Sequence, residues 1–234
     1  MKRLISAIFI IMLCMSTALA DDQVFTGEKY QESLTGYSLT VFWNEGNQPE
    51  RALLEDIQKV YFESYCAMRE TFGTTDVTDV RIFLVDESSM SGNSVAYTTN
   101  TDIYCSRQFL EQSQGNLNCI VHELFHVVQN GYPGAADDEL ISALCEGLAD
   151  AARYEYGVFE DTNWSLPAYD ESQSYMDSYT VTASFLNWTA EAYDKTLCIR
   201  LNRVLHEDSY SDGFWQKVTG YTLDELWELY SQAE

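Results

Sequence analysis

Short apolar runs in the first half of the chain predict β-strands. Residues 37–43 and 80–85 are rich in β-branched and aromatic side chains and are bounded by polar or turn-forming positions, which is typical of buried strands. Residues 94–106 predict a hairpin, because Val-Ala-Tyr-Thr and Ile-Tyr-Cys flank the turn sequence Asn-Thr-Asp at 100–102. We therefore expect a small sheet in the N-terminal half.

A helical repeat of apolar residues lies between the first two of these strands. From residue 53 to residue 68, apolar side chains recur at three- and four-residue intervals, so that they share one face of a helix. Pro49 is suited to open this helix, and Gly73 is suited to end it. After Arg107 the pattern becomes helical again.

Helical spacing dominates the second half of the chain. Gly131 is placed as a C-terminal cap of the first segment, and Pro133 blocks its continuation. Thr222 and Glu225 form a capping-box pattern at the start of the last segment. The segments that we expect to be helical are residues 117–130, 140–156, 179–193, 196–206 and 223–230. Strands first and helices after them predict an α+β fold.

The N-terminus has the pattern of a secretory signal peptide. A basic pair precedes an apolar run, and Ala-Leu-Ala at residues 18–20 is a small-residue cleavage site. The apolar run is shorter than the ~20 residues that a membrane span needs, so we favour export over an uncleaved anchor. We predict a signal peptide at residues 1–20 and a single secreted domain at residues 21–234.

The chain is strongly acidic, with a formal net charge of −24. Such a surface repels nucleic-acid phosphates and anionic lipids, so we expect neither nucleic acid nor membranes as partners. It suits a soluble extracellular protein, which we expect to be a monomer. One of the six cysteines lies in the predicted signal peptide, and the other five allow at most two disulfides. Buried thiols are the alternative.

Residues 122–126 read His-Glu-Leu-Phe-His within a segment of helical spacing. Two histidines four residues apart on a helix stand on one face, so both imidazoles can reach a single metal ion. Glu123 lies beside that face, where its carboxylate can take a proton from the attacking water and pass it to the leaving amine. The pattern predicts His122 and His126 as zinc ligands and Glu123 as the catalytic base. A helix with ordinary core or surface histidines is the structural alternative.

A third ligand must come from elsewhere, because catalytic zinc usually takes three protein ligands and leaves a fourth position for water. Glu146 and Asp150 lie four residues apart on the next predicted helix and therefore face the same way. The turn at residues 131–134 lets this helix return beside the first. We predict that Glu146 binds the metal and that Asp150 accepts the ring N–H of His122, which fixes its tautomer. The reverse assignment of the two carboxylates is the alternative.

This arrangement resembles that of the gluzincin metallopeptidases. In that group nineteen residues separate the second histidine from the ligand glutamate, and nineteen separate His126 from Glu146 here. The metzincin pattern does not fit, because it needs glycine at Gln129 and histidine at Tyr132. The resemblance implies a zincin-like fold with a small N-terminal mixed sheet, an edge strand over the cleft, an active-site helix and a mainly helical C-terminal half.

A closer resemblance, to the basic secretory protein family of zinc peptidases known from plants and microbes, covers most of the predicted mature chain. The segments that carry it are His-Glu-Leu-Phe-His-Val-Val-Gln at 122–129, Glu-Gly-Leu-Ala-Asp at 146–150, and residues 95–98, 102–104, 179–186 and 209–215. This chain departs from the family in being acidic, and it has Val-Gln-Asn at 128–130 where the family often has Trp-Gln-Trp. The resemblance therefore implies the core chemistry and not the substrate.

Peptide hydrolysis also needs a donor for the oxyanion of the tetrahedral intermediate. Tyr179, in a family-like segment, is our candidate, and His206 is the alternative. Ordinary packing would also explain Tyr179, and an ordinary position at a helix edge would explain His206. The hairpin at residues 95–104 provides an edge onto which an extended peptide could pair, or else it is an ordinary part of the sheet.

Two functions follow from these patterns. The first is a secreted zinc-dependent endopeptidase, with Zn²⁺ as its cofactor and a peptide or protein as its substrate. The second is a secreted binding or defence module whose zinc site is structural or vestigial. Structural sites normally have four protein ligands, so Cys145 as a fourth ligand would favour the second function. The intact Glu123 favours the first.

Overall fold

The strands form one mixed sheet. A computed structural model describes residues 8–11, 18–19, 23–32, 36–92, 94–112, 116–161 and 163–233. Its strands are β1 (Ile8–Ile11), β2 (Ala18–Leu19), β3 (Gln23–Glu32), β4 (Ser38–Asn44), β5 (Asp79–Val85), β6 (Ala96–Thr99) and β7 (Asp102–Ser106). They pair in the order β1-β3-β4-β5-β7-β6, with β2 also on β3. The pairs β4–β5 and β5–β7 are parallel and the others are antiparallel, so the expected mixed sheet forms and β6 lies at its edge.

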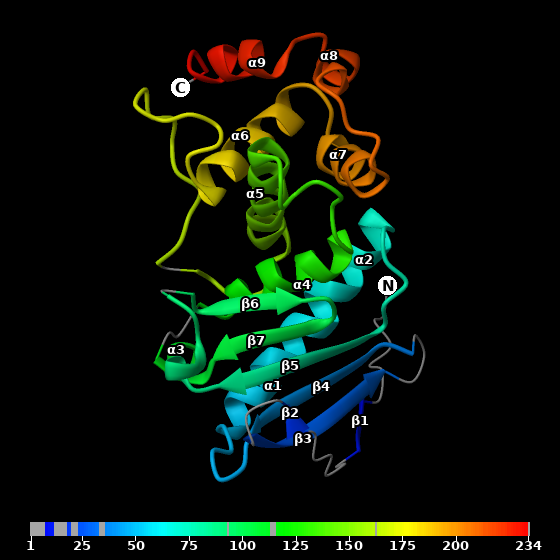
Figure 1. The fold of residues 1–234 in the computed structure, drawn as a ribbon, viewed down its shortest axis with the longest axis vertical. Coiled ribbons are helices and arrows are strands. Elements are labelled where there is room, and N and C mark those ends of the chain that lie inside the picture. The colour runs from blue at the N-terminus through cyan, green and yellow to red at the C-terminus, as the bar shows by residue number, and fades with distance from the viewer. Residues whose placement is uncertain are drawn as a thin grey trace, which may run out of the picture.

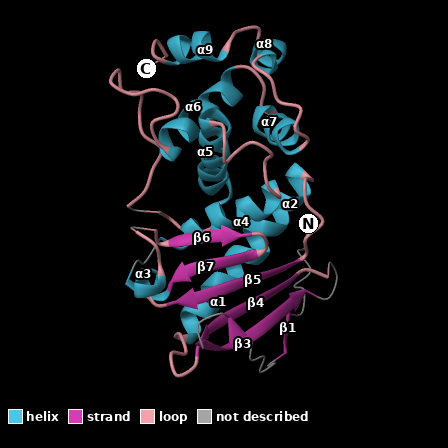
Figure 2. Ribbon diagram, in the orientation of Figure 1, coloured by secondary structure: helices cyan, strands magenta, loops and turns pink. Residues whose placement is uncertain are grey.

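The helices gather on one side of the sheet and beyond it. They are α1 (Arg51–Val60), α2 (Cys66–Phe72), α3 (Arg107–Gln112), α4 (Cys119–Gln129), α5 (Glu139–Tyr156), α6 (Tyr179–Ala192), α7 (Leu197–His206), α8 (Gly213–Thr219) and α9 (Leu223–Tyr230). Figure 1 shows α5 to α9 at the end of the molecule opposite β3, with α4 between them and the sheet. The α+β prediction is therefore confirmed, and Figure 2 shows the strands at one end of the molecule, with α1 to α4 beside them and the other helices toward the opposite end.

The predicted signal peptide is described only in part. Its segments β1 and β2 both pair antiparallel with β3, and the rest of residues 1–20 lies outside the described residues. Removal of residues 1–20 would leave β3 as the second edge of the sheet, since β4 occupies its other side. Cleavage therefore stays a prediction. Among the described residues, none of the helices has the length and hydrophobicity of a membrane span.

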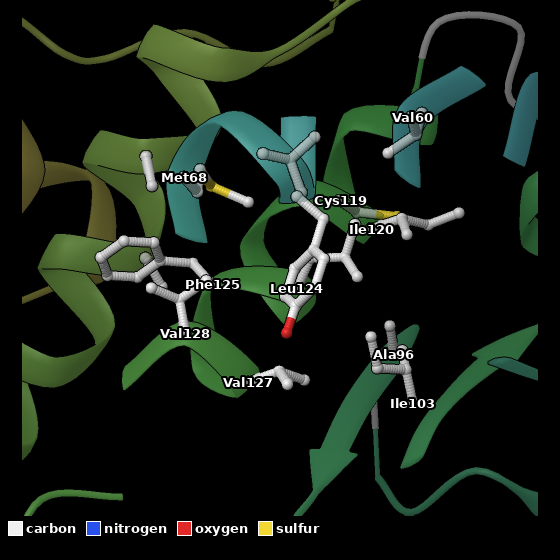
Figure 3. Close-up of a cluster of buried hydrophobic side chains, with 14 of the residues drawn as sticks. Val60, Met68, Ala96, Ile103, Cys119, Ile120, Leu124, Phe125, Val127 and Val128 are labelled. Carbon is white, nitrogen blue, oxygen red and sulfur yellow. The ribbon is translucent and has the colours of Figure 1, made fainter. Parts of the chain in front are cut away.

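The long helix between the first two predicted strands forms as α1 and α2, joined by a π-helical turn over Tyr61–Tyr65. Gly73 ends it in the left-handed region, at φ 67°, where glycine has no steric penalty. The apolar faces of these helices and of α4 meet the hairpin in a common core. Figure 3 shows Met68, Leu124 and Phe125 within this core, with Ala96 and Ile103 on the strands beside them.

Three details differ from the expectations. The C-terminal cap of α4 is Asn130, at φ 54°, and not Gly131, which follows it with a φ of 77°. Asparagine tolerates the left-handed region almost as glycine does, so the helix can end one residue earlier. The segments β3 and α8 were not predicted, since polar and apolar residues in β3 do not alternate cleanly and α8 is only 7 residues long.

Candidate metal centre

Helix α4 carries four polar side chains that are shielded from most of the solvent. His122 and Glu123 are 9% and 8% exposed, His126 is partly buried one turn further on, and Gln129 at the end of the helix is buried. The other residues of α4 are apolar and belong to the core. Burying polar groups is costly unless they have partners, so the contacts of these side chains show what the site is built to hold.

The three predicted ligands converge on one point. The Nε2 atoms of His122 and His126 are 3.1 Å apart, and Oε2 of Glu146 in α5 lies 3.3 Å from the first and 3.7 Å from the second. Ligands about 2.0–2.1 Å from a tetrahedral metal lie about 3.3 Å from one another, so this spacing fits a single ion. Within the described part of the chain, these residues are the one such group of histidine, cysteine and carboxylate ligand atoms.

The Nδ1 atom of each imidazole has a hydrogen-bond partner. Nδ1 of His122 lies 2.8 Å from Oδ1 of Asp150, as the sequence predicts, and Nδ1 of His126 lies 2.7 Å from Oε1 of Gln129. An acceptor at Nδ1 keeps the proton there and leaves the Nε2 lone pair for a metal. The reversed carboxylate assignment does not fit, because Asp150 faces Nδ1 of His122 whereas Glu146 faces Nε2.

The charge around these imidazoles also favours a cation. Three carboxylates, those of Glu123, Glu146 and Asp150, surround the two rings. Burial lowers the pKa of His122, but hydrogen bonds to Asp150 and Glu146 outweigh it and raise the pKa to about 10. Burial likewise acts against the charge of Glu146, yet His122 and His126 bring the pKa of that carboxyl below its usual value. A group of side chains that attracts a proton so strongly suits a divalent metal ion.

The carboxylate of Glu123 is fixed by the edge strand of the sheet. The hydroxyl of Thr98 in β6 donates to its Oε2 over 2.7 Å. Residues 98 and 123 are brought together because β6 packs against α4, as the two elements do in Figure 1. The carboxylate beside the candidate ligands is thus held by a hydrogen bond from the edge strand of the sheet.

A cavity of about 570 Å³ opens beside these groups. Its wall includes His122 and Glu123, the start of β6 at residues 94–96, and residues 177–180 at the start of α6. Arg153 and Trp164 lie at the same cavity, with the guanidinium 4.0 Å from the ring centroid and the charge paired to Asp161. The cavity is of the size that encloses a small ligand or a few side chains of a larger one.

The chain matches one known protein family over most of its length. The model of the BSP family, described as "Peptidase of plants and bacteria", matches residues 35–230. The chain belongs to this family. The match extends from before β4 to the end of α9 and contains every residue of the metal centre, so the expected membership of the basic secretory protein family is confirmed. A search of curated proteins finds no match.

Tyr179 lies at the mouth of this BSP site. Its ring stacks on His122 with centroids 6.1 Å apart and an interplanar angle of 25°, and the side chain is 54% exposed. The charge of Glu146, and then partial burial, raises the pKa of its phenol. His206, the alternative donor, is engaged with the backbone oxygen of Gln129, 3.1 Å from its Nδ1, and does not line the cavity. The geometry therefore leaves Tyr179 as the candidate donor.

None of the described cysteines belongs to the group of candidate metal ligands. Cys145 precedes Glu146, but its Sγ donates to Oε1 of Gln129 over 3.3 Å. The expected disulfides are not seen, because Cys105, Cys119, Cys145 and Cys198 are free thiols in the structure. Burial raises the pKa of all four, to about 12 for Cys119, Cys145 and Cys198, which keeps them protonated. This matches the alternative of buried thiols.

Sequence reasoning assigned no role to Thr98 and Gln129. Thr98 contacts Glu123 across 25 positions of sequence, and no local pattern announces such a pairing. Gln129 was within reach, because it lies three residues after His126 and so on the same face of the helix. A buried amide at that position is a signal for a partner of the histidine.

Proposed function

We propose that this BSP chain is a secreted zinc-dependent endopeptidase, with His122, His126 and Glu146 as metal ligands and Glu123 as the catalytic base. The observation that carries the proposal is the convergence of three ligand atoms within 4.8 Å of one another, beside a carboxylate and an open cavity. Membership of a peptidase family supports proteolysis in general. We propose that the chain acts as a monomer in the extracellular medium, where its substrate is a peptide or a protein. Neither nucleic acid nor a membrane is a proposed partner.

Each residue of the site has a separate role in the proposed reaction. When bound, zinc supplies a Lewis acid that polarises the scissile carbonyl and activates water. Glu123 accepts the proton of the attacking water and later donates it to the leaving amine, while Thr98 holds its carboxylate in place. Asp150 keeps the ring of His122 in its orientation. Tyr179, whose raised pKa keeps its hydroxyl protonated, donates to the developing oxyanion.

The substrate is proposed to bind in an extended form along β6. This strand is the edge of the sheet, and its first residues line the cavity beside His122. Backbone pairing to an edge strand depends little on side-chain sequence, which suits an endopeptidase of broad selectivity.

The alternative function, a binding or defence module with a structural zinc, has less support. Structural zinc sites usually have four protein ligands, whereas the described residues offer three. Cys145, the candidate fourth ligand, is engaged with Gln129. A structural site also has no use for a carboxylate held beside the ligands, as that of Glu123 is.

The substitution Glu123→Gln tests the peptidase directly. It keeps the size of the side chain but removes the base, so casein cleavage should fall by at least ~100-fold while zinc content stays at one ion per chain. Glu70→Gln, an exposed substitution on α2, is the control and should leave both unchanged. Full activity in Glu123→Gln would show that this carboxylate is not the base.

Secretion has its own test. Protein recovered from the culture medium should begin at Asp21 if residues 1–20 form a cleaved signal peptide. An intact N-terminus on the exported chain, or retention of the chain in the cell, would contradict this part of the proposal.

A further inference from the structure

Gln129 lies at a junction of three helices. It is the last residue of α4 and is 1% exposed. Its Oε1 lies 2.7 Å from Nδ1 of His126, and its Nε2 donates over 2.7 Å to the backbone oxygen of Cys145 in α5. Its own backbone oxygen faces Nδ1 of His206 in α7 at 3.1 Å. An amide so enclosed has a fixed orientation, and that orientation has chemical consequences.

The backbone carbonyl of Cys145 decides which way round the amide lies. A carbonyl oxygen can only accept, so the group that faces it must be the NH₂ of Gln129. The amide oxygen then faces His126, and it too can only accept. Nδ1 of His126 must therefore carry the proton. Its Nε2 is left with the lone pair that points toward His122 and Glu146.

The two histidines differ in this respect. Asp150 is a carboxylate that can only accept, so it sets the tautomer of His122 without help. The amide of Gln129 could either donate to His126 or accept from it, and the hydrogen bond to the carbonyl of Cys145 determines that it accepts. Because Cys145 immediately precedes Glu146, the segment that supplies one predicted ligand also sets the protonation of another.

We propose that Gln129 is a positioning residue that fixes the Nδ1–H tautomer of His126 and ties the helix of the two histidines to the helix of Glu146. The inference rests on the proposed function in one respect, namely that His126 is a metal ligand. The Sγ of Cys145, 3.3 Å from Oε1, adds a weak second donor that holds the amide oxygen in place. Loss of the amide is expected to weaken metal binding even though Gln129 touches no metal.

Two substitutions and one matched control measure the effect on zinc affinity. Gln129→Met keeps the length of the side chain and removes its hydrogen bonds to His126 and Cys145, whereas Gln129→Glu keeps an acceptor for His126. Asn118→Leu is the control, because Asn118 is a similarly buried amide that bonds the backbone oxygen of Phe159 at 2.7 Å and the backbone nitrogen of Val158 at 3.1 Å and none of the proposed ligands. In competition with a chelator, Gln129→Met should bind zinc ~10- to 100-fold more weakly than the wild type. Asn118→Leu should stay near the wild-type affinity. Gln129→Glu keeps the acceptor for His126 but loses the donor to Cys145, so its affinity should lie between those of the wild type and Gln129→Met.

The tautomer can be read without any metal. Long-range ¹H–¹⁵N spectra of the zinc-free protein at mildly alkaline pH should show the proton on Nδ1 of His126, and on Nε2 in Gln129→Met. A wild type with the proton on Nε2 overturns the inference, whether or not zinc binds. So does a loss of affinity in Asn118→Leu as large as that in Gln129→Met. A wild type that binds no zinc overturns the proposed function instead, and the spectra still decide the role of Gln129.

Discussion

At the scale of single residues, the two imidazoles and the carboxylate of the proposed base are each oriented by a hydrogen bond to a neighbouring side chain. Asp150 and Gln129 hold the two imidazoles, and the hydroxyl of Thr98 holds the carboxylate of Glu123. Hydrogen bonds to charged or metal-binding groups are stronger than neutral ones, so the removal of one partner has effects beyond its own contact. The clearest case is Thr98, because its hydroxyl donates a hydrogen bond to the carboxylate of the proposed base.

Thr98→Val should lower kcat while zinc stays bound. The substitution keeps the β-branched shape and removes only the hydroxyl, so Glu123 loses the bond that orients it. A hydrogen bond to a charged group contributes about 1.5–3 kcal/mol, so we expect a decrease in kcat of ~10-fold or more. Steady-state kinetics and metal content measure the two effects.

Thr99→Val is the matched control for this prediction, since Thr99 is the next residue of β6 and is exposed. It should leave kcat unchanged. Equal decreases in the two variants would indicate damage to the strand and not loss of the bond to Glu123.

At the scale of elements, the site depends on how closely α5 packs against its neighbours. Glu146 and Asp150 reach the imidazoles of α4 only because α5 returns beside that helix, and α6, which packs on α5, brings Tyr179 against His122. Gly147 allows this approach, because a Cβ at that position would overlap the side chain of the buried Thr182 in α6. The glycine next to the ligand glutamate therefore has a packing role.

Gly147→Ala should destabilise the fold by about 1–3 kcal/mol, the usual cost of overpacking a close contact. Alanine favours helices by itself, so any loss must come from the overlap with Thr182. Urea unfolding of the zinc-free protein measures the change in the free energy of unfolding.

Gly213→Ala provides the control for this substitution. The nearest atom to a Cβ at that position is Oγ of Ser211 at 3.8 Å, an ordinary contact, so stability should stay the same or rise slightly. If Gly147→Ala behaved in the same way, the tight approach of α5 and α6 would have no energetic importance.

At the scale of the whole molecule, a metal would join the sheet half to the helical half. Its proposed ligands come from α4, which packs on the strands, and from α5, which packs on α6 and α7. Figure 1 shows these two helices at the boundary between the halves. An ion at that boundary would therefore stabilise the fold as well as support the reaction.

Removal of zinc should lower the melting temperature. At a free zinc concentration of 1,000 times Kd, binding stabilises the folded state by about 4 kcal/mol, which for a domain of this size is roughly 8–16 °C in Tm. Thermal unfolding with zinc and with a chelator measures the difference. Glu146→Gln is the control and should show a much smaller difference. An unchanged Tm on chelation of the wild type would argue against a metal at this boundary.

The features that could be predicted from the sequence are those that depend on residues close together along the chain. Periodicity located most helices and strands, and the pattern at residues 122–126 with Glu146 and Asp150 indicated which groups converge. These predictions succeeded because helical spacing is local physics, set by a repeat of about 3.6 residues. The family match covers the same residues.

The contacts that join distant segments could not be predicted and became known from the folded structure. The bond from Thr98 to Glu123, the choice of Gln129 orientation by Cys145 and the place of β6 at the sheet edge all depend on strand order and helix packing. No local pattern contains that information, because strand order and the approach of two helices are set by the burial of side chains from the whole chain. The same reason explains why β3, with its mixed polar and apolar residues, emerges only beside β4.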